Sequence, residues 1–159
     1  MNSNLSKEPL DFYISNEINV KSNEILILCK EKRNNEMLDI YSDVNPFTNE
    51  RISKTYTLEN YNYIKKNIEK DTVTKYWTEK DKISSYFKAI IPFKKINSYR
   101  LENIGSKIIY NVISDPFYIE DKKIVIFYHR SSSSDNVIVM KKTNEEWEII
   151  EKIPSQKLH

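Results

Sequence analysis

Apolar and polar residues alternate most regularly in the C-terminal third of the chain. From Lys107 onward, short runs rich in Ile, Val, Tyr and Phe are separated by short polar turns, which is typical of antiparallel strands. The runs cover residues 107–113, 116–119, 123–129, 136–142 and 146–153. This pattern predicts an antiparallel meander, and Trp147, which alternates with two water-facing glutamates, is expected to anchor the last strand in the core.

Helical spacing dominates further upstream, in residues 58–70. Apolar side chains recur there every three or four positions, at Leu58, Tyr61, Ile64 and Ile68. Thr57 can cap the first turn, and Glu59 places a carboxylate where the helix dipole favours negative charge. We expect a helix over this segment.

Residues 78–91 carry a second helical pattern, with an end that also suits a strand. Apolar residues occupy one helical face, at Ile83, Tyr86, Phe87, Ile90 and Ile91. Thr78 followed by Asp81 resembles a capping box, and Pro92 must end the helix. We expect a helix here, although the β-rich residues before Pro92 leave the choice between helix and strand open for residues 79–91.

The N-terminal quarter predicts a hairpin. Residues 25–30 form a buried apolar run, residues 31–36 form a charged turn, and residues 37–44 alternate polar with apolar side chains. Residues 10–18 suit a short strand or a docking segment, and residues 1–9 a flexible tail. The pattern predicts one α+β domain over residues 10–155, in which one or two helices pack on an antiparallel sheet made of the N-terminal hairpin and the C-terminal meander.

Two scarce residue types exclude several classes of site. Gly105 is the only glycine, so glycine-rich dinucleotide and phosphate loops are absent. Cys29 is the only cysteine, which excludes a disulfide within the chain and a cysteine-based zinc site. Because Cys29 lies in an apolar run, we expect it to be a small buried side chain. We expect no bound cofactor.

Targeting signals are not visible in the sequence. No apolar run approaches the ~20 residues of a membrane-spanning helix, so no membrane span is expected. Residues 1–20 lack the basic start and apolar centre of a signal peptide. The compartment stays open, because the numbering of an exported form could begin after a removed leader.

Positive charge is concentrated in the middle of the chain. Residues 51–110 carry 13 basic and 6 acidic side chains, although the net charge of the whole chain is only +2. A basic, tyrosine-rich segment could meet nucleic acid, with Lys65, Lys66, Lys94 and Lys95 as candidate contacts. The segment lacks a known single-strand motif, and several of its aromatic residues fall on predicted buried faces. A solvated helix face is therefore the favoured interpretation.

The stretch IVIFYHRSSSSDNVIVMKK, residues 124–142, raises the question of a nucleophile beside its base. A Ser–His pair also needs an orienting acid and an oxyanion hole, and a flexible, glycine-free tip between two strands suits neither. Loops on rigid sheets often carry recognition. We therefore expect no catalytic residues here and instead expect a partner-binding tip, with contacts from His129, Arg130, Ser132, Ser133 and Asp135.

A metal site is not expected. His129 is the only histidine apart from the last residue of the sequence, and there is no thiol cluster that could hold zinc. Acidic pairs such as Asp39 and Asp43 do not have the spacing of a calcium loop. Solvated carboxylates are the favoured interpretation.

Four segments near the C-terminus follow one another in a recognisable order, namely Ile113–Phe117, Ile124–Tyr128, Val137–Lys142 and Glu146–Ile150. An S-x-P-F segment, a strand, a variable tip and a hairpin that contains Trp make this region resemble the meander of many small uncharacterised bacterial proteins, some exported and some immunity-like. The chain departs from that pattern with Ser131–Ser134 at the tip, where many relatives carry Gly or Cys, and with Glu145–Glu146 where Gly usually precedes Trp. The resemblance implies an α+β binding protein rather than an enzyme.

These observations favour a non-catalytic interaction protein, immunity-like or envelope-associated, whose partner is another protein. One alternative is an enzyme or small-molecule binder with a cone-shaped fold, whose pocket lies between helix and curved sheet. Its candidate residues are Tyr41, Asp39, Tyr128 and His129. The second alternative, which the sequence favours less, is nucleic-acid binding through residues 65–100.

Overall fold

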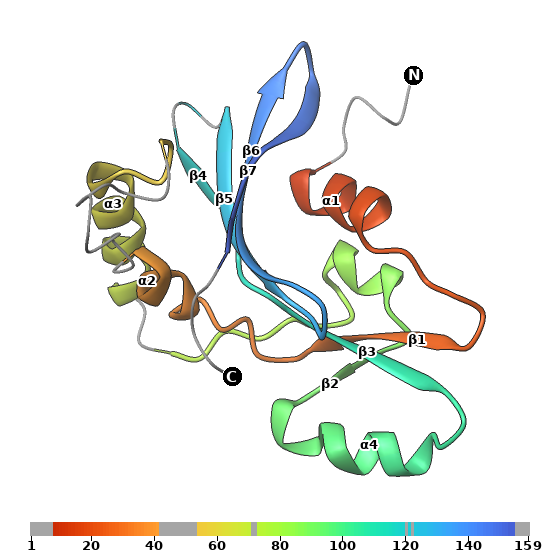
Figure 1. The fold of residues 1–159 in the computed structure, drawn as a ribbon. Coiled ribbons are helices and arrows are strands. Elements are labelled where there is room, and N and C mark those ends of the chain that lie inside the picture. The colour runs from red at the N-terminus through yellow and green to blue at the C-terminus, as the bar shows by residue number, and fades with distance from the viewer. Residues whose placement is uncertain (1–7, 42–53, 71–72, 120, 122, 155–159) are drawn as a thin grey trace, which may run out of the picture.

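The computed structural model describes residues 8–41, 54–70, 73–119, 121 and 123–154. The α-helices are α1 (Pro9–Glu17), α2 (Glu36–Tyr41), α3 (Leu58–Glu69) and α4 (Ile96–Glu102), and the 3₁₀ helices are η2 (Lys82–Tyr86) and η3 (Phe93–Lys95). The strands are β1 (Glu24–Cys29), β2 (Ala89–Ile91), β3 (Lys107–Ile113), β4 (Phe117–Ile119), β5 (Ile124–Arg130), β6 (Asp135–Thr143) and β7 (Glu146–Pro154). Figure 1 shows their arrangement.

The described strands form one open, mostly antiparallel sheet. Its order is β2-β1-β3-β5-β6-β7, and β4 pairs with β5 outside this path. Strand β1 runs parallel to β2 and β3, whereas β5, β6 and β7 form an antiparallel meander. In Figure 1, α1 lies on one side of the meander and α2 and α3 lie on the other. The α+β fold class predicted from the sequence is therefore confirmed.

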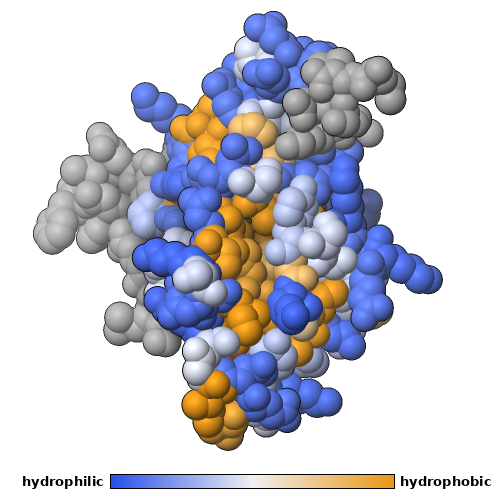
Figure 2. All heavy atoms as spheres, turned by 90° about the vertical axis from the view of Figure 1, so that its right-hand side faces the viewer, coloured by the Kyte–Doolittle hydropathy of each residue, from blue (hydrophilic) through white to orange (hydrophobic). Residues whose placement is uncertain are grey.

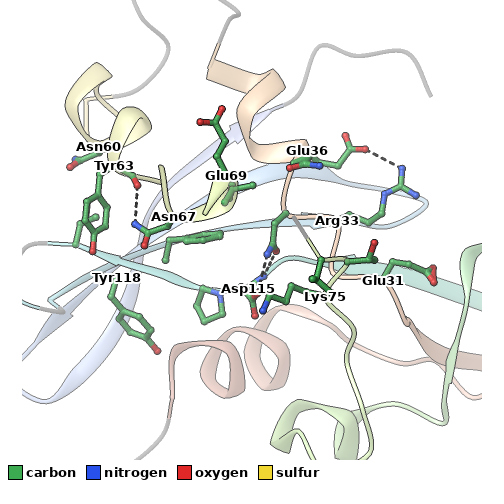
Figure 3. A pocket seen from close by; sticks show the side chains of 18 of the residues that line it. Glu31, Arg33, Glu36, Asn60, Tyr63, Asn67, Glu69, Lys75, Asp115 and Tyr118 are labelled. Atoms are coloured by element: carbon green, nitrogen blue, oxygen red, sulfur yellow. Dashed lines mark hydrogen bonds and ion pairs between the residues drawn. The ribbon is translucent and has the colours of Figure 1, made fainter. Parts of the chain in front are cut away.

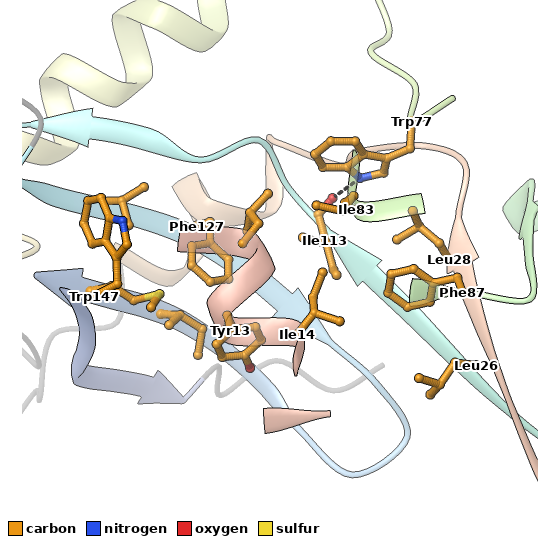
Figure 4. Close-up of a cluster of buried hydrophobic side chains, with 14 residues drawn as sticks. Tyr13, Ile14, Leu26, Leu28, Trp77, Ile83, Phe87, Ile113, Phe127 and Trp147 are labelled. Carbon is orange, nitrogen blue, oxygen red and sulfur yellow. Dashed lines mark hydrogen bonds between the residues drawn. The ribbon is translucent and has the colours of Figure 1, made fainter. Parts of the chain in front are cut away.

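A core fills the space between α1 and the sheet. Helix α1 contributes Leu10, Tyr13 and Ile14, each no more than 5% exposed. The ring of Tyr13 meets the ring of Phe127 edge to face, with 5.1 Å between centroids. Figure 4 shows the ring of Tyr13 beside that of Phe127, and Trp77, Phe87 and residues of β1 belong to the same cluster. Burial of this apolar surface is the main stabilising contribution to this side of the fold.

A second core lies on the opposite face of the sheet, under α2 and α3. Its members include Met37 from α2, Ile64 from α3 and Tyr128 from β5. Because both faces are covered, Ile124 to His129 are all buried, which explains why β5 reads as a continuous apolar run rather than an alternating one.

The predicted C-terminal strands and the helix over residues 58–70 are confirmed. Thr57 caps α3, since its side-chain oxygen accepts a hydrogen bond from the Asn60 amide at 3.3 Å. The turn between β6 and β7 places Asn144 and Glu145 at positive φ values of 51° and 66°, as a two-residue hairpin turn requires. Trp147 is buried, as expected, and so is Cys29.

The predicted N-terminal hairpin is wrong, because residues 36–41 form helix α2 instead of a second strand. Residues 42–44 of the predicted strand lie outside the described residues. The chain turns at Arg33, whose φ is 55°, and Arg33 forms an ion pair with Glu36 at 3.2 Å across the start of the helix. Instead of a hairpin partner, β1 has parallel neighbours that come from far along the chain.

The helix expected over residues 78–91 does not form, and the strand that the sequence left open as an alternative is confirmed for residues 89–91. The segment forms the short helix η2 and then strand β2, which pairs with β1. Ser84 and Ser85 donate side-chain hydrogen bonds to backbone carbonyls three residues earlier, which competes with a regular α-helix. The expected cap contact does form, because the Thr78 amide donates to Asp81 Oδ2 at 2.7 Å.

Residues 10–18 were expected to form a strand or docking segment, but residues 9–17 form α1. Pro9 stands at the first helical position, where its missing N–H has no intrahelical partner to lose. Residues 1–7 of the predicted tail lie outside the described residues.

Candidate functional site

The structure places His129 inside the protein rather than at the tip of the β5–β6 hairpin. Its side chain is directed to the α1 face of the sheet, and the residue is only 4% exposed. Its Nδ1 lies 2.7 Å from the Tyr13 hydroxyl, and its Nε2 lies 2.8 Å from Asn111 Oδ1. A buried His129 cannot contact a partner directly. This member of the predicted binding tip is instead part of the core.

The hydrogen bonds around His129 indicate which of its ring nitrogens carries the proton. The Asn111 amide nitrogen donates to the carbonyl oxygens of Ile27 and Ile109, which leaves Oδ1 to accept from His129 Nε2–H. His129 Nδ1 then accepts from Tyr13. The pKa of His129 is lowered to about 4, mainly by burial and also by the charge of Lys152, while the charge of Asp135 acts in the opposite direction. The imidazole is therefore neutral and joins α1 to β3 and β5.

The rest of the predicted tip presents little chemistry. Ser132 and Ser133 are exposed, and the turn is closed by a hydrogen bond from the Ser131 amide to the Ser134 carbonyl at 2.7 Å. Asp135 Oδ1 accepts a hydrogen bond from the Tyr128 hydroxyl at 2.6 Å. Arg130 is half-buried. Two short hydroxyl side chains at a closed turn offer a small contact surface, and the partner-binding role of the tip stays a prediction.

The candidate nucleic-acid contacts lie on two separate elements. Lys65 and Lys66 belong to α3, whereas Lys94 and Lys95 belong to η3 at the edge of β2. Figure 1 shows α3 beside the meander, with the segment before α4 at the other end of the molecule. The structure does not bring these two lysine pairs together.

The residues proposed for a pocket between helix and curved sheet are also separated. Tyr128 and His129 are consecutive in β5, so their side chains lie on opposite faces of the sheet. The side chains of Asp39 and Tyr41 lie outside the described part of the chain. Side chains of the first core fill the space between α1 and the sheet.

An open groove lies instead between α3 and β4, here called the α3–β4 groove (Figure 3). Its volume is about 1360 Å³. The described lining comes from residues 31 and 33–36 before and within α2, from α3, from residues 73–75, and from residues 115–119 and 121.

Helix α3 forms one wall of the groove with a stripe of polar side chains. Asn60, Tyr63 and Asn67 stand three and four residues apart, which places them on one helical face. Tyr63 is 52% exposed, so its ring is available to a ligand. Asn67 donates a hydrogen bond from Nδ2 to the Tyr63 carbonyl at 2.9 Å, which fixes its amide with Oδ1 left as an acceptor.

The end of the groove is held by a network around Asp115. Its Oδ1 lies 2.7 Å from Lys32 Nζ, and its Oδ2 accepts from Asn34 Nδ2 at 3.0 Å. The Asp115 amide in turn donates to Asn34 Oδ1 at 2.8 Å. Lys32 Nζ also lies 4.3 Å from the centroid of the Trp77 ring. These contacts attach the β1–α2 connection to the β3–β4 connection and make this corner rigid.

The groove is acidic although the chain as a whole is slightly basic. Among the described lining residues, six carboxylates face two cations, namely Glu31, Glu36, Glu59, Glu69, Asp115 and Asp121 against Arg33 and Lys75. Two lysines outside the lining form ion pairs with it. Lys32 Nζ lies 2.7 Å from Asp115, and Lys65 Nζ lies 4.0 Å from Glu69. With both of these included, the groove remains negative by two charges, while the net charge of the chain is +2.

Strand β4 forms the other wall with its edge. Phe117 and Ile119 contact the core under α3, whereas Tyr118 packs on the α1 side and donates to Glu8 Oε2 at 3.2 Å. All three residues line the groove, so the groove reaches around the strand edge, and in Figure 3 Tyr118 lies across the strand from Tyr63. Burial, followed by the charge of Glu8, raises the pKa of Tyr118 to about 12.

Sequence reasoning missed this site. Its residues come from four segments, and the parallel pairing of β1 with β3 brings two of them together at the Asp115 corner. One signal was present, because Asn60, Tyr63 and Asn67 share a face of a predicted helix and none of them is needed for its core.

The described lining of the groove contains no His, Cys or Ser side chain. Among all described residues, no group of three or more His, Cys, Asp or Glu side chains is arranged to hold a metal ion. None of the described helices has the length and apolar character needed to cross a membrane.

Another side of the molecule has a different character. Figure 2 shows apolar side chains gathered near the centre of the side where α1 meets the lower part of the sheet, with hydrophilic residues around them. Val20, Leu101 and Ile104, in and near the connections that flank β1 and β3, are 52%, 71% and 84% exposed. Nothing in the structure shows what would cover this surface.

Comparisons of the chain with family models, with characterised proteins and with solved structures gave no match. The resemblance of the C-terminal third to small bacterial proteins therefore stays a prediction. The α3–β4 groove, defined by its own geometry and charge, is the basis for a functional proposal.

Proposed function

We propose that the protein is a non-catalytic binding module and that its partner is another protein, held in the α3–β4 groove. The observation that carries this proposal is the excess of carboxylates in an open groove on a chain of opposite net charge. A cationic protein surface is the complementary partner.

The size of the groove supports a macromolecular partner over a small molecule. Pockets for small ligands have volumes of roughly 300–1,000 Å³ and enclose most of the ligand. The groove is larger, at about 1360 Å³, and it is only partly enclosed. A protein segment can fill such a surface, whereas a small molecule would leave much of it in contact with water.

The side chains of the groove also favour recognition over chemistry. The described lining combines carboxylates, amides and the exposed ring of Tyr63, and the Asp115 corner is already held by Lys32 and Asn34. Tyrosine and rigid polar groups of this kind contribute contact area at low cost in conformational entropy.

Isosteric removal of charge tests the proposal. A groove variant combines Glu59→Gln, Glu69→Gln and Asp121→Asn, and a matched control combines Glu145→Gln, Glu146→Gln and Glu148→Gln on the β6–β7 hairpin. Both variants lose three negative charges from exposed positions, so any effect of net charge is the same for both.

The purified protein and both variants are compared in their affinity for cationic partner proteins recovered from the native host. Exposed charges contribute modestly one by one, so we expect the groove variant to bind about tenfold more weakly and the control to bind like the parent. Equal weakening in both variants, or none in either, would contradict a binding site in the groove.

A further inference from the structure

We propose that the partner inserts an extended segment that pairs as an added strand with the outer edge of β4 and directs Lys or Arg side chains toward α3. This inference rests on the proposed function, because it specifies how the α3–β4 groove is filled. It identifies the occupant by its backbone conformation and its charge pattern.

The outer edge of β4 is open among the described residues. Strand β4 pairs with β5 through Phe117, Tyr118 and Ile119, and it has no second neighbour in the described sheet. Strand β3 continues on the same side of β5 but pairs with it further along, through Val112 and Ile113. An edge strand presents unpaired backbone N–H and C=O groups, which an extended segment can satisfy.

The groove lies where an added strand would run. Side chains from both faces of β4 line it, so the strand edge faces the hollow. Neighbouring strands lie about 4.8 Å apart, and the side chains of an added strand alternate between the two faces of the sheet. Every second side chain of the inserted segment would therefore be directed toward α3.

The wall of α3 specifies what those side chains must be. Glu59 and Glu69 flank the stripe of Asn60, Tyr63 and Asn67. Carboxylates, amide oxygens and the face of a tyrosine ring all attract ammonium and guanidinium groups. Because β4 is only three residues long, its backbone can form few hydrogen bonds, so charge supplies much of the affinity and the strand edge sets the orientation.

Three synthetic peptides separate the two parts of the inference, which are backbone pairing with β4 and the attraction of cationic side chains to the groove. The first is a ten-residue peptide of alternating Lys and Thr, the second has the same sequence with every backbone amide N-methylated, and the third has Glu in place of Lys. The N-methylated peptide keeps the charges but cannot donate backbone hydrogen bonds. Affinities for the full chain are measured by isothermal titration calorimetry at low and high salt.

We expect the Lys–Thr peptide to bind, the N-methylated peptide to bind at least about tenfold more weakly, and the Glu–Thr peptide not to bind. Binding of the first peptide should weaken at high salt. Equal affinities of the Lys–Thr and N-methylated peptides would overturn strand addition but leave protein binding in the groove intact. Absence of binding by the Lys–Thr peptide at millimolar concentration would overturn the inference as a whole.

Discussion

Helices α1 and α3 cover opposite faces of the same sheet, but they do so in different ways. Helix α1 turns large apolar side chains inward, and Tyr13 and Ile14 reach the sheet with 3% and 2% exposure. Helix α3 buries only Ile64 completely and turns amides and a tyrosine toward its other neighbour, β4. One helix closes its face of the sheet, and the other leaves the α3–β4 groove.

The difference shows how the composition of a helix determines the use of a surface. Where every inward position is large and apolar, packing approaches the density of a protein interior and no ligand space remains. Where a helix has one strong apolar anchor and a polar stripe beside it, the stripe stays solvated and available for contacts. The comparison predicts that mutations in the α1 core act on stability, while mutations in the polar stripe of α3 act on binding.

The largest effect is expected from a cavity on the α1 side. Phe127 is fully buried against Tyr13, so Phe127→Ala should lower the free energy of unfolding by about 3–5 kcal/mol. Tyr63→Ala removes a ring of similar size from the groove wall and should change stability by less than about 0.5 kcal/mol. Urea denaturation measures the free energy of unfolding of both variants. Similar losses of stability would contradict the distinction between the packed α1 face and the solvated stripe of α3.

A smaller effect is expected from pH, through His129. Its pKa is about 4 in the folded protein and about 6.5 when unfolded, so the unfolded state binds the proton more readily between these values. The stabilisation is fully present above about pH 6.5 and is lost as pH falls toward about 4, a change of roughly 3 kcal/mol.

The groups that face His129 are Tyr13 from α1, Asn111 from β3, Lys152 from β7 and Asp135 from β6. Denaturation measured across this range in the parent and in His129→Gln isolates the contribution of the imidazole from that of the carboxylates. A parent curve that parallels the curve of the variant would show that His129 is not the buried neutral group described here.

A loss of stability smaller than that at Phe127 or through His129 is expected at the Asp115 corner of the groove. Asp115→Asn keeps the shape but removes the charge that pairs with Lys32, and both side chains are partly buried, with 28% and 15% exposure. We expect a loss of about 0.5–1 kcal/mol that shrinks at high salt. Glu146→Gln, at an exposed site on β7, is the control and should have no measurable effect. A larger loss at Glu146 would contradict the structural role of the corner.

The elements with local signals could be predicted from the sequence. Alternation and short turns defined the C-terminal meander, and Thr57 with regularly spaced apolar residues defined α3. The elements that depend on distant partners could not. For the segment of β2 the sequence left helix or strand open, and its pairing with β1 makes it a strand. Residues 36–41 are helical although their alternating pattern suits a strand.

The site was harder to predict than the fold. His129 was expected at the surface because it precedes a serine-rich tip, but the orientation of β5 turns it inward to Tyr13 and Asn111. Because both faces of the sheet are covered along β5, either direction of the side chain leads into a core, and the sequence near the end of a hairpin does not show how far that cover extends. The groove was missed because parallel pairing assembles it from distant segments.

Backbone amide hydrogen exchange at β4, followed by NMR with and without the Lys–Thr peptide, tests the role of the groove most directly. We predict that at least one amide of Phe117–Ile119 exchanges rapidly in the free protein and is protected when the peptide binds, while amides of α1 do not change. Protection confined to other elements, or none in β4 at saturating peptide, would contradict the assignment of the α3–β4 groove as the site where a partner strand is added.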